Sequence, residues 1–174
     1  MSKISTKTIM YSVYDKTSGK AKYIDDTTSY KRPEIEMLTD GFSGAGIMGE
    51  IDLPTLGQLG GLEGELGFNK TNTKMIGLFT PTAHTLEIRW VTNVLDTATG
   101  NVLVRSNKEI IKILPKKIDL GEIESNETNE SSMTYEILSY QYLIEGKTVL
   151  KIDKLNNVFI VNGKDYSKKI RDLL

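Results

Sequence analysis

The side chains best suited to chemistry are scarce in this 174-residue chain, which holds one histidine, His84, and no cysteine. The absence of cysteine excludes disulfides, thiolate nucleophiles and thiolate metal ligands, and a lone histidine excludes a paired-histidine metal site. His84 stands at the start of an alternating segment, without a serine nearby in a nucleophile-elbow context. We therefore interpret it as a strand-edge or loop histidine and expect a protein that is not an enzyme and needs no cofactor or metal.

Residues 44–49 match the G-x-G-x-x-G pattern of dinucleotide-binding folds. That site needs a buried strand before the glycines and a helix N-terminus after them, so that backbone amides meet the pyrophosphate. The preceding residues 39–43 form a poor strand pattern, and residues 50–54 do not begin a helix. We interpret the match as chance in a glycine-rich loop.

A second group of polar residues is acidic. Its carboxylates could converge on Ca²⁺, but the ligand order of an EF-hand is absent. A solvated loop between two strands is the simpler interpretation. The residues are Asp119, Glu122, Glu124, Glu127 and Glu130.

Composition narrows the class of protein further. The chain has 22 Lys and Arg against 23 Asp and Glu, so no overall charge draws it to nucleic acid or to an anionic membrane. No apolar run reaches the about 20 residues of a membrane helix, so we expect no stable membrane binding. The basic N-terminal residues are not followed by the apolar segment that a secretory signal needs, so we expect synthesis in the cytoplasm.

The elements that carry these residues are mainly strands, because period-two alternation dominates. We expect strands at 9–14, 21–24 and 85–90, two short strands or one bulged strand over 102–114 closed by Pro115, and further strands at 133–144, 148–153 and 158–161. Glu145-Gly146 predicts a tight hairpin. One helix is expected at 69–79, capped by Thr71 or Asn72. The predicted fold is mainly β: one domain (1–174), an antiparallel β-sandwich or half-barrel with one flanking α-helix and a long extended loop.

The middle segment, 25–61, has little regular periodicity yet is rich in apolar residues. A mobile loop with so much apolar surface would be insoluble alone, so we expect it to dock on another subunit; a hairpin folded on its own barrel is the alternative. The C-terminal segment, 166–174, is expected to be a second contact. The predicted interface residues are Pro33, Ile35, Met37, Leu38, Phe42, Gly44, Gly46, Ile47, Met48, Ile170, Leu173 and Leu174.

Two blocks of sequence resemble a known family. Residues 42–49, preceded by 33–38 and followed by 62–68, resemble the long loop and following strand of the major tail tube proteins of contractile phage tails. Residues 119–122, the strand at 133–144, the turn at 145–147 and the segments 152–156 and 161–165 resemble the strand and hairpin pattern that ends these proteins. The resemblance spans residues 9–174.

The resemblance implies a structural subunit that self-assembles into stacked hexameric rings. These form the inner tube of a contractile tail or a phage-tail-like bacteriocin, a conduit for DNA or for membrane puncture. It implies as partners the tail sheath protein and the baseplate and tail terminator proteins, in a virion tail or an extracellular tail-like particle.

A lumen that passes DNA should be polar and not basic, because cationic walls hold phosphates. Glu87, Glu136, Lys147 and Lys151 are the predicted lumen residues. A β-rich ligand- or glycan-binding module, with the glycine-rich segment shaping its site, remains the alternative function.

Overall fold

The computed structural model describes residues 3–174, and strands make up 58% of it. The predicted mainly β, antiparallel fold is confirmed, with two short helices and, over residues 3–174, no closed barrel. The strands are β1 (Lys3–Asp15), β2 (Lys22–Ile24), β3 (Thr27–Lys31), β4 (Met37–Phe42), β5 (Ile51–Leu59), β6 (Glu63–Phe68), β7 (His84–Asp96), β8 (Val102–Asp119), β9 (Ser131–Ile144), β10 (Lys147–Asp153), β11 (Val158–Val161) and β12 (Lys164–Asp165). The helices are α1 (Thr73–Leu78) and α2 (Lys168–Leu173).

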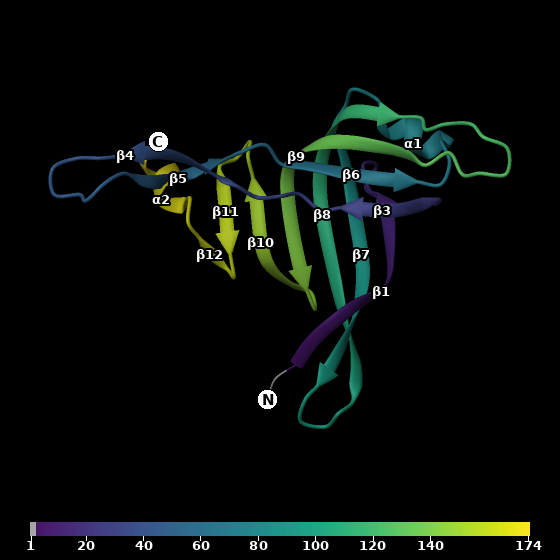
Figure 1. Ribbon diagram of the computed structural model, residues 1–174, viewed down its shortest axis with the longest axis horizontal. Helices are drawn as coiled ribbons and strands as arrows, with labels where there is room; N and C mark the ends of the chain where they lie inside the picture. The colour runs from purple at the N-terminus through teal and green to yellow at the C-terminus, as the bar shows by residue number, and fades with distance from the viewer. Residues whose placement is uncertain (1–2) are drawn as a thin grey trace.

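The main sheet is a meander with the order β12-β11-β10-β9-β8-β7-β1-β2, and β3 and β6 extend it from β9 (Figure 1). Its two longest strands, β8 and β9, pair along most of their lengths, with register shifts at Lys112/Ile113 and at Pro115/Lys117. Bulges bend strands and increase their twist. The first part of β9 can therefore pair with β6 while its second part pairs with β10.

Pro115 does not end the strand, contrary to the sequence prediction. It lies inside β8 at the second register shift, opposite Tyr135 of β9. A bulge tolerates proline because a ladder hydrogen bond is already interrupted there. The polar residues 106–109 do not interrupt β8 either, since Asn107 and Glu109 are buried and have partners of their own.

The predicted hairpin at Glu145-Gly146 is confirmed. Both residues have positive φ, 48° and 78°, and they join β9 to β10. Positive φ at both central positions defines the type I′ turn, whose twist matches that of the flanking strands. Asn162-Gly163 forms the same kind of turn between β11 and β12, with φ of 48° and 82°.

The hydrophobic core lies on one face of the main sheet, beneath β6 and α1. Residues at alternate positions of the long strands, such as Leu86, Ile88 and Ile111, belong to one cluster with Leu66 of β6 and Met75 of α1. All five are at most 1% exposed. This covered face leaves the other face of β1, β7, β8, β9 and β10 without a comparable buried cluster.

Helix α1 is shorter than predicted, because Asn72 caps it and Phe79 ends it. The Asn72 side chain accepts a hydrogen bond from the Met75 backbone N–H at 2.8 Å. Met75 and Leu78 are buried, whereas Ile76 and Phe79 are 48% and 39% exposed. No helix within residues 3–174 has the length and apolar character needed to span a bilayer.

The middle segment contains three strands, β3, β4 and β5, where regular structure was not expected. β3 pairs with β6, while β4 and β5 pair only with each other as a separate two-stranded sheet. We call residues 33–61 the arm. In Figure 1 the arm projects at one end of the molecule past β11, β12 and α2.

Candidate functional site: assembly surfaces

The arm is an amphipathic hairpin with an exposed apolar face. Phe42 pairs with Ile51 and Asp40 with Leu53, and because directly opposed residues share a face, these four lie together with Leu38. The opposite face carries Thr39, Asp52 and Pro54. Phe42 is 51% exposed, and Ile51 and Leu53 are each 46% exposed, so nothing in the described chain covers this face fully.

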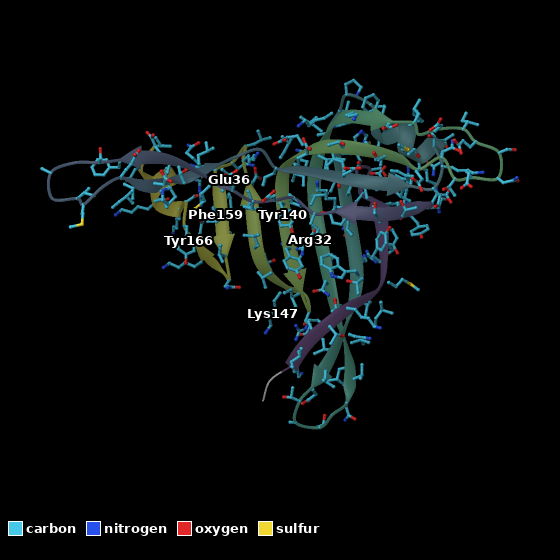
Figure 2. All side chains as sticks on the ribbon, in the orientation of Figure 1. Arg32, Glu36, Tyr140, Lys147, Phe159 and Tyr166 are labelled. Carbon is cyan, nitrogen blue, oxygen red and sulfur yellow. The ribbon has the colours of Figure 1, made fainter. Side chains whose placement is uncertain are left out.

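The base of the arm is joined to the main sheet by an ionic cluster around one buried carboxylate. Glu109 of β8 is fully buried and forms an ion pair with Arg32, the residue just before the arm. The Arg32 Nε donates to Glu109 Oε1 at 2.6 Å, and the Tyr30 and Tyr140 hydroxyls donate to the same carboxylate at 2.6 and 2.5 Å. Figure 2 shows Arg32 and Tyr140 close together in the centre of the molecule.

An aromatic pair completes this cluster. The rings of Trp90 and Tyr142 stack with centroids 5.6 Å apart, and the Arg32 guanidinium lies 4.7 Å from the Tyr142 centroid. Burial and the Glu109 charge raise the pKa values of Tyr30 and Tyr140, so both remain hydrogen-bond donors. Burial acts to lower the pKa of Arg32, but the Glu109 charge outweighs it and raises that pKa overall. The arm therefore begins next to a residue held by an ion pair, hydrogen bonds and ring contacts to the main sheet.

The C-terminal helix α2 lies beside the arm. A side chain at Gly57 of β5 would place its Cβ 3.1 Å from Ile170 Cδ1. Arg171 holds α2 in place by donating to the Asn157 carbonyl oxygen at 2.6 Å and by pairing with Asp165 at 2.5 Å. Leu173 and Leu174 remain 78% and 99% exposed. Ile170 thus contacts the arm of its own chain, whereas Leu173 and Leu174 are available to another molecule.

The two edges of the main sheet are open. At one edge β2 covers only residues 13–15 of β1, so the outer side of β1 from Lys3 to Ser12 has no strand partner among residues 3–174. At the other edge β12 is two residues long. Unpaired edges offer backbone hydrogen bonds to another strand.

The face of the main sheet opposite the core carries cationic and aliphatic side chains in rows. One row runs Ser12, Arg89, Lys108 and Leu143, and the next runs Tyr14, Glu87, Ile110, Gln141 and Lys151. The row beyond these contains Lys112, Ser139 and Asp153. We call the residues of the three rows the bare face. All of them except Glu87 are exposed or half-buried.

The predicted lumen residues fall in three places. Glu87 and Lys151 lie in the same row of the bare face, but Glu87 is 1% exposed and pairs with Lys16 and Arg89. Glu136 lies at the bend of β9, where it accepts hydrogen bonds from Lys154 and the Leu62 backbone. Lys147 is exposed at the end of the β9–β10 hairpin.

The residues considered for chemistry lie apart from one another. His84 is buried, with Nε2 2.9 Å from Thr80 Oγ1. Residues 44–49 form the tip of the arm and lead into a strand, not a helix. Asp119 ends β8, and the acidic residues from Glu122 to Glu130 lie in the exposed loop that follows it. Residues 3–174 contain no cluster of three or more potential ligands placed to hold a metal ion.

Sequence reasoning missed the Arg32–Glu109 anchor and two lysines of the bare face, Lys108 and Lys112. A signal for the anchor was present, since Glu109 interrupts a β-branched run at a position where a charge is costly without a partner. Lys108 and Lys112 could have been placed by alternation once β8 was taken as one strand.

An exposed apolar arm and a sheet with two open edges are typical of proteins that assemble with other chains. The model of the family described as phage tail tube protein FII matches residues 17–174, and the chain belongs to this family. The resemblance found in the sequence is thereby confirmed, and the family is a structural one that places the chain in a virion tail or tail-like particle.

Among solved structures, the chain is similar to one in a cryo-EM structure of the anti-feeding prophage (AFP) baseplate, 6-fold symmetrised. The identity is 12% and the TM-score 0.47, over 80% of this chain and 97% of that chain. No curated protein matches the sequence.

Proposed function

We propose that this chain is a non-catalytic subunit that assembles into stacked hexameric rings, which form the inner tube of a contractile phage tail or tail-like bacteriocin. The tube would serve as a conduit for DNA or for membrane puncture, enclosed by a sheath and ended by baseplate and terminator proteins. The family match supports the tube role, and six-fold rings follow from what the tail tube resemblance implies.

The observation that carries the proposal is the combination of open edges and arm. On its outer side β1 has ten residues, Lys3 to Ser12, without a strand partner. Such an edge is an aggregation hazard unless another strand covers it. Joining the β1 edge of one copy to the β11–β12 edge of the next covers both edges and continues the sheet. Because the arm projects past β12 (Figure 1), its apolar face would then lie over a neighbouring subunit.

We assign the bare face to the lumen. The other side of the main sheet bears β3, β6 and α1, and the arm starts from there. When subunits close into a tube, the outer side of the wall has a larger circumference than the inner side. The side of the sheet that carries the additional strands and α1 therefore fits best on the outside. The bare face therefore turns inward, and the arm, α1 and α2 turn toward neighbouring rings and the sheath.

Negative-stain electron microscopy of the purified chain at high concentration, with sedimentation velocity alongside, tests this proposal. Rings or hollow tubes are expected from the wild-type chain. A chain that stays monomeric both alone and in the presence of a baseplate-like initiator would contradict it, and binding of a glycan or small ligand to that monomer would support the alternative module.

A further inference from the structure

The apolar face of the arm contains one carboxylate, Asp40. It lies opposite Leu53 and two residues from Phe42 along β4, so its neighbours on this face are apolar. Within residues 3–174, Asp40 is exposed and forms no ion pair. A surface that covers this face must therefore supply a cation as well as apolar side chains, because a carboxylate buried without a partner is costly.

The arm as a whole is acidic. Residues 33–61 contain five carboxylates and no Lys, Arg or His. Two of the carboxylates lie at the base of the arm, in a hollow that Lys31 also lines, whereas Asp40, Glu50 and Asp52 belong to the projecting hairpin. Among residues 3–174 no cation, those of the nearby α2 included, forms an ion pair with these three. A partner for the arm should thus carry positive charge.

One end of the main sheet offers such a surface. β9 ends at Ile144, opposite Asn107 of β8. Beyond this point the sheet continues as β1, β7 and β8 alone, and we call this part, residues 3–10 and 91–106, the extension. Figure 1 shows the extension projecting from one end of the strands, whereas the arm lies toward the other end.

The extension exposes aliphatic side chains. Ile4, Leu95 and Val102 form one row across its three strands, and Val104 lies on the same side. Val102 and Val104 are each 67% exposed, and Met10 is 72% exposed. Nothing within residues 3–174 covers this side, so it is available to another copy of the chain.

The charges of the extension are mainly positive. It carries Lys3, Lys7 and Arg105 against one carboxylate, Asp96, and the adjoining turn at 145–147 adds one charge of each sign. Lys3 lies opposite Asp96 in the strand register, but within the described chain none of the four forms an ion pair. Lys7 is exposed and lies in the register shift that precedes residue 8.

The proposed ring places these two surfaces against each other. If the sheet edges join around the ring, the strands run along the tube axis, and the two ends of the strands face the neighbouring rings. The extension of one ring then reaches the end of the next ring that carries the arm. The two register shifts of β1 bend and twist the extension, which turns its apolar side out of the plane of the bare face.

We propose that the arm of one copy docks on the extension of a copy in the next ring, with Asp40 paired to Lys7 and with Phe42 and Ile51 against Val102 and Val104. The inference rests on the proposed tube and names the contact that stacks its rings. Because the arm and the extension are different surfaces of one chain, the contact is head-to-tail and repeats from ring to ring without closing.

The end of the molecule that carries α1 is less suited to receive the arm. Ile76 and Ile123 are exposed there, at 48% and 88%. The loop around Ile123 holds the carboxylates from Glu122 to Glu130, however, and these would oppose the carboxylates of the arm. Like charges across an interface cost several kcal/mol in general, and the extension carries the opposite sign.

Reversal of the two charges tests the pairing. Lys7→Glu alone and Asp40→Lys alone should each raise the concentration needed for tube formation by about tenfold or more, because each places like charges together. The double variant, Asp40→Lys with Lys7→Glu, should return that concentration to within about threefold of the wild-type value. Electron microscopy, which distinguishes single rings from tubes, and sedimentation velocity measure the effect.

Matched controls use charges that lie outside the contact. Asp52→Lys reverses a charge on the opposite face of the arm, and Lys20→Glu reverses one in the turn between β1 and β2. Both should form tubes near the wild-type concentration, and Asp52→Lys should not rescue Lys7→Glu. Tubes from Lys7→Glu at the wild-type concentration, or a double variant no better than its parents, would overturn the pairing.

A cysteine cross-link tests the contact without relying on tube formation. The natural chain has no cysteine, so a mixture of an Asp40→Cys chain and a Lys7→Cys chain can form a disulfide between them only through the introduced thiols. We expect a covalent dimer in the oxidised mixture and much less with an Asp52→Cys chain in place of Asp40→Cys. Equal yields from both mixtures would refute the contact. Absence of rings and tubes from the wild-type chain would count against the proposed function, and the cross-link at high concentration would still decide whether arm and extension meet.

Discussion

Arg32 and Glu109, which are 77 residues apart in the sequence, form an ion pair that joins the start of the arm to the centre of the main sheet. The Glu109 side chain is fully buried, whereas the Arg32 side chain remains 47% exposed. Removing the carboxylate charge would leave Arg32 partly solvated but without its partner, and would weaken the hydrogen bonds from Tyr30 and Tyr140.

Glu109→Gln should therefore destabilise the monomer by about 2 kcal/mol, less than the loss expected for a fully buried pair because water reaches Arg32. Urea unfolding at neutral pH measures this change. Glu63→Gln, which breaks the exposed pair with Lys116, is the control and should change stability by less than about 0.5 kcal/mol.

The same anchor predicts a change in dynamics. In Glu109→Gln, amide hydrogen exchange should speed up in β3 and the arm before it does so in β7 or β9, because the anchor holds only the arm's base. Uniform exchange rates across the arm in wild type and variant would indicate that β3–β6 pairing alone fixes the arm.

Stability should fall in acid, with Glu87 as one cause. Burial acts to raise the pKa of Glu87, but hydrogen bonds and charges from Lys16 and Arg89 lower it below its ordinary value of 4.5. A lowered pKa in the folded state adds stability that is complete above about pH 4.5 and is lost as the pH falls through the folded pKa. Glu87→Gln should thus flatten the decline in the free energy of unfolding between about pH 5 and pH 3.

Other carboxylates with lowered pKa values, such as Glu136 beside Lys154, contribute to the same decline. The comparison that isolates Glu87 is the difference between wild type and Glu87→Gln at each pH. A difference that stays constant from neutral to acid pH would contradict the assignment.

Much of the main sheet could be predicted from local pattern. Alternation marked the strand around Leu86 and Ile88, and the dipeptide Glu145-Gly146 located its hairpin, because period and turn chemistry are properties of neighbouring residues. The rest depended on distant partners. From local sequence alone, Pro115 and Glu109 look like breaks in β8. The strand continues because Pro115 lies at a bulge, where no ladder hydrogen bond is needed, and because Arg32 neutralises the buried charge of Glu109.

The arm was identified by composition but not by its structure. Leu38, Asp40 and Phe42 alternate with Thr39 and Gly41 in β4, but glycines and Pro54 obscure the pattern in β5. Its large exposed apolar surface was deduced from the sequence, whereas its shape as a hairpin with one apolar face required the pairing of β4 with β5. Which molecule covers that face stays a prediction.

The arm's apolar face should be needed for assembly and not for folding. Phe42, Ile51 and Leu53 are about half exposed in the monomer. Replacing all three with serine therefore removes apolar surface that contributes little to folding, so monomer stability should change little while tube formation is lost. Circular dichroism and electron microscopy measure the two effects. Thr39→Ala with Asp52→Asn alters the opposite face and is the control, for which we expect normal tubes.

The last residues of the chain should act in the same way as the arm, but independently of it. Leu173 and Leu174 are almost fully exposed, and Ile170 and Arg171 already hold α2 against the arm and the Asn157 carbonyl. Leu173→Ser with Leu174→Ser should leave the urea midpoint unchanged and raise the concentration needed for tube formation by about tenfold, since burial of two leucines stabilises a contact by more than 1.4 kcal/mol, or roughly tenfold in affinity. Tubes that form at the wild-type concentration would show that the C-terminus lies outside every subunit contact. Removal of all residues after Asp165 is a less specific test. It also breaks the Arg171–Asp165 ion pair and deletes the buried Ser167, which lies close to Gly57 of the arm.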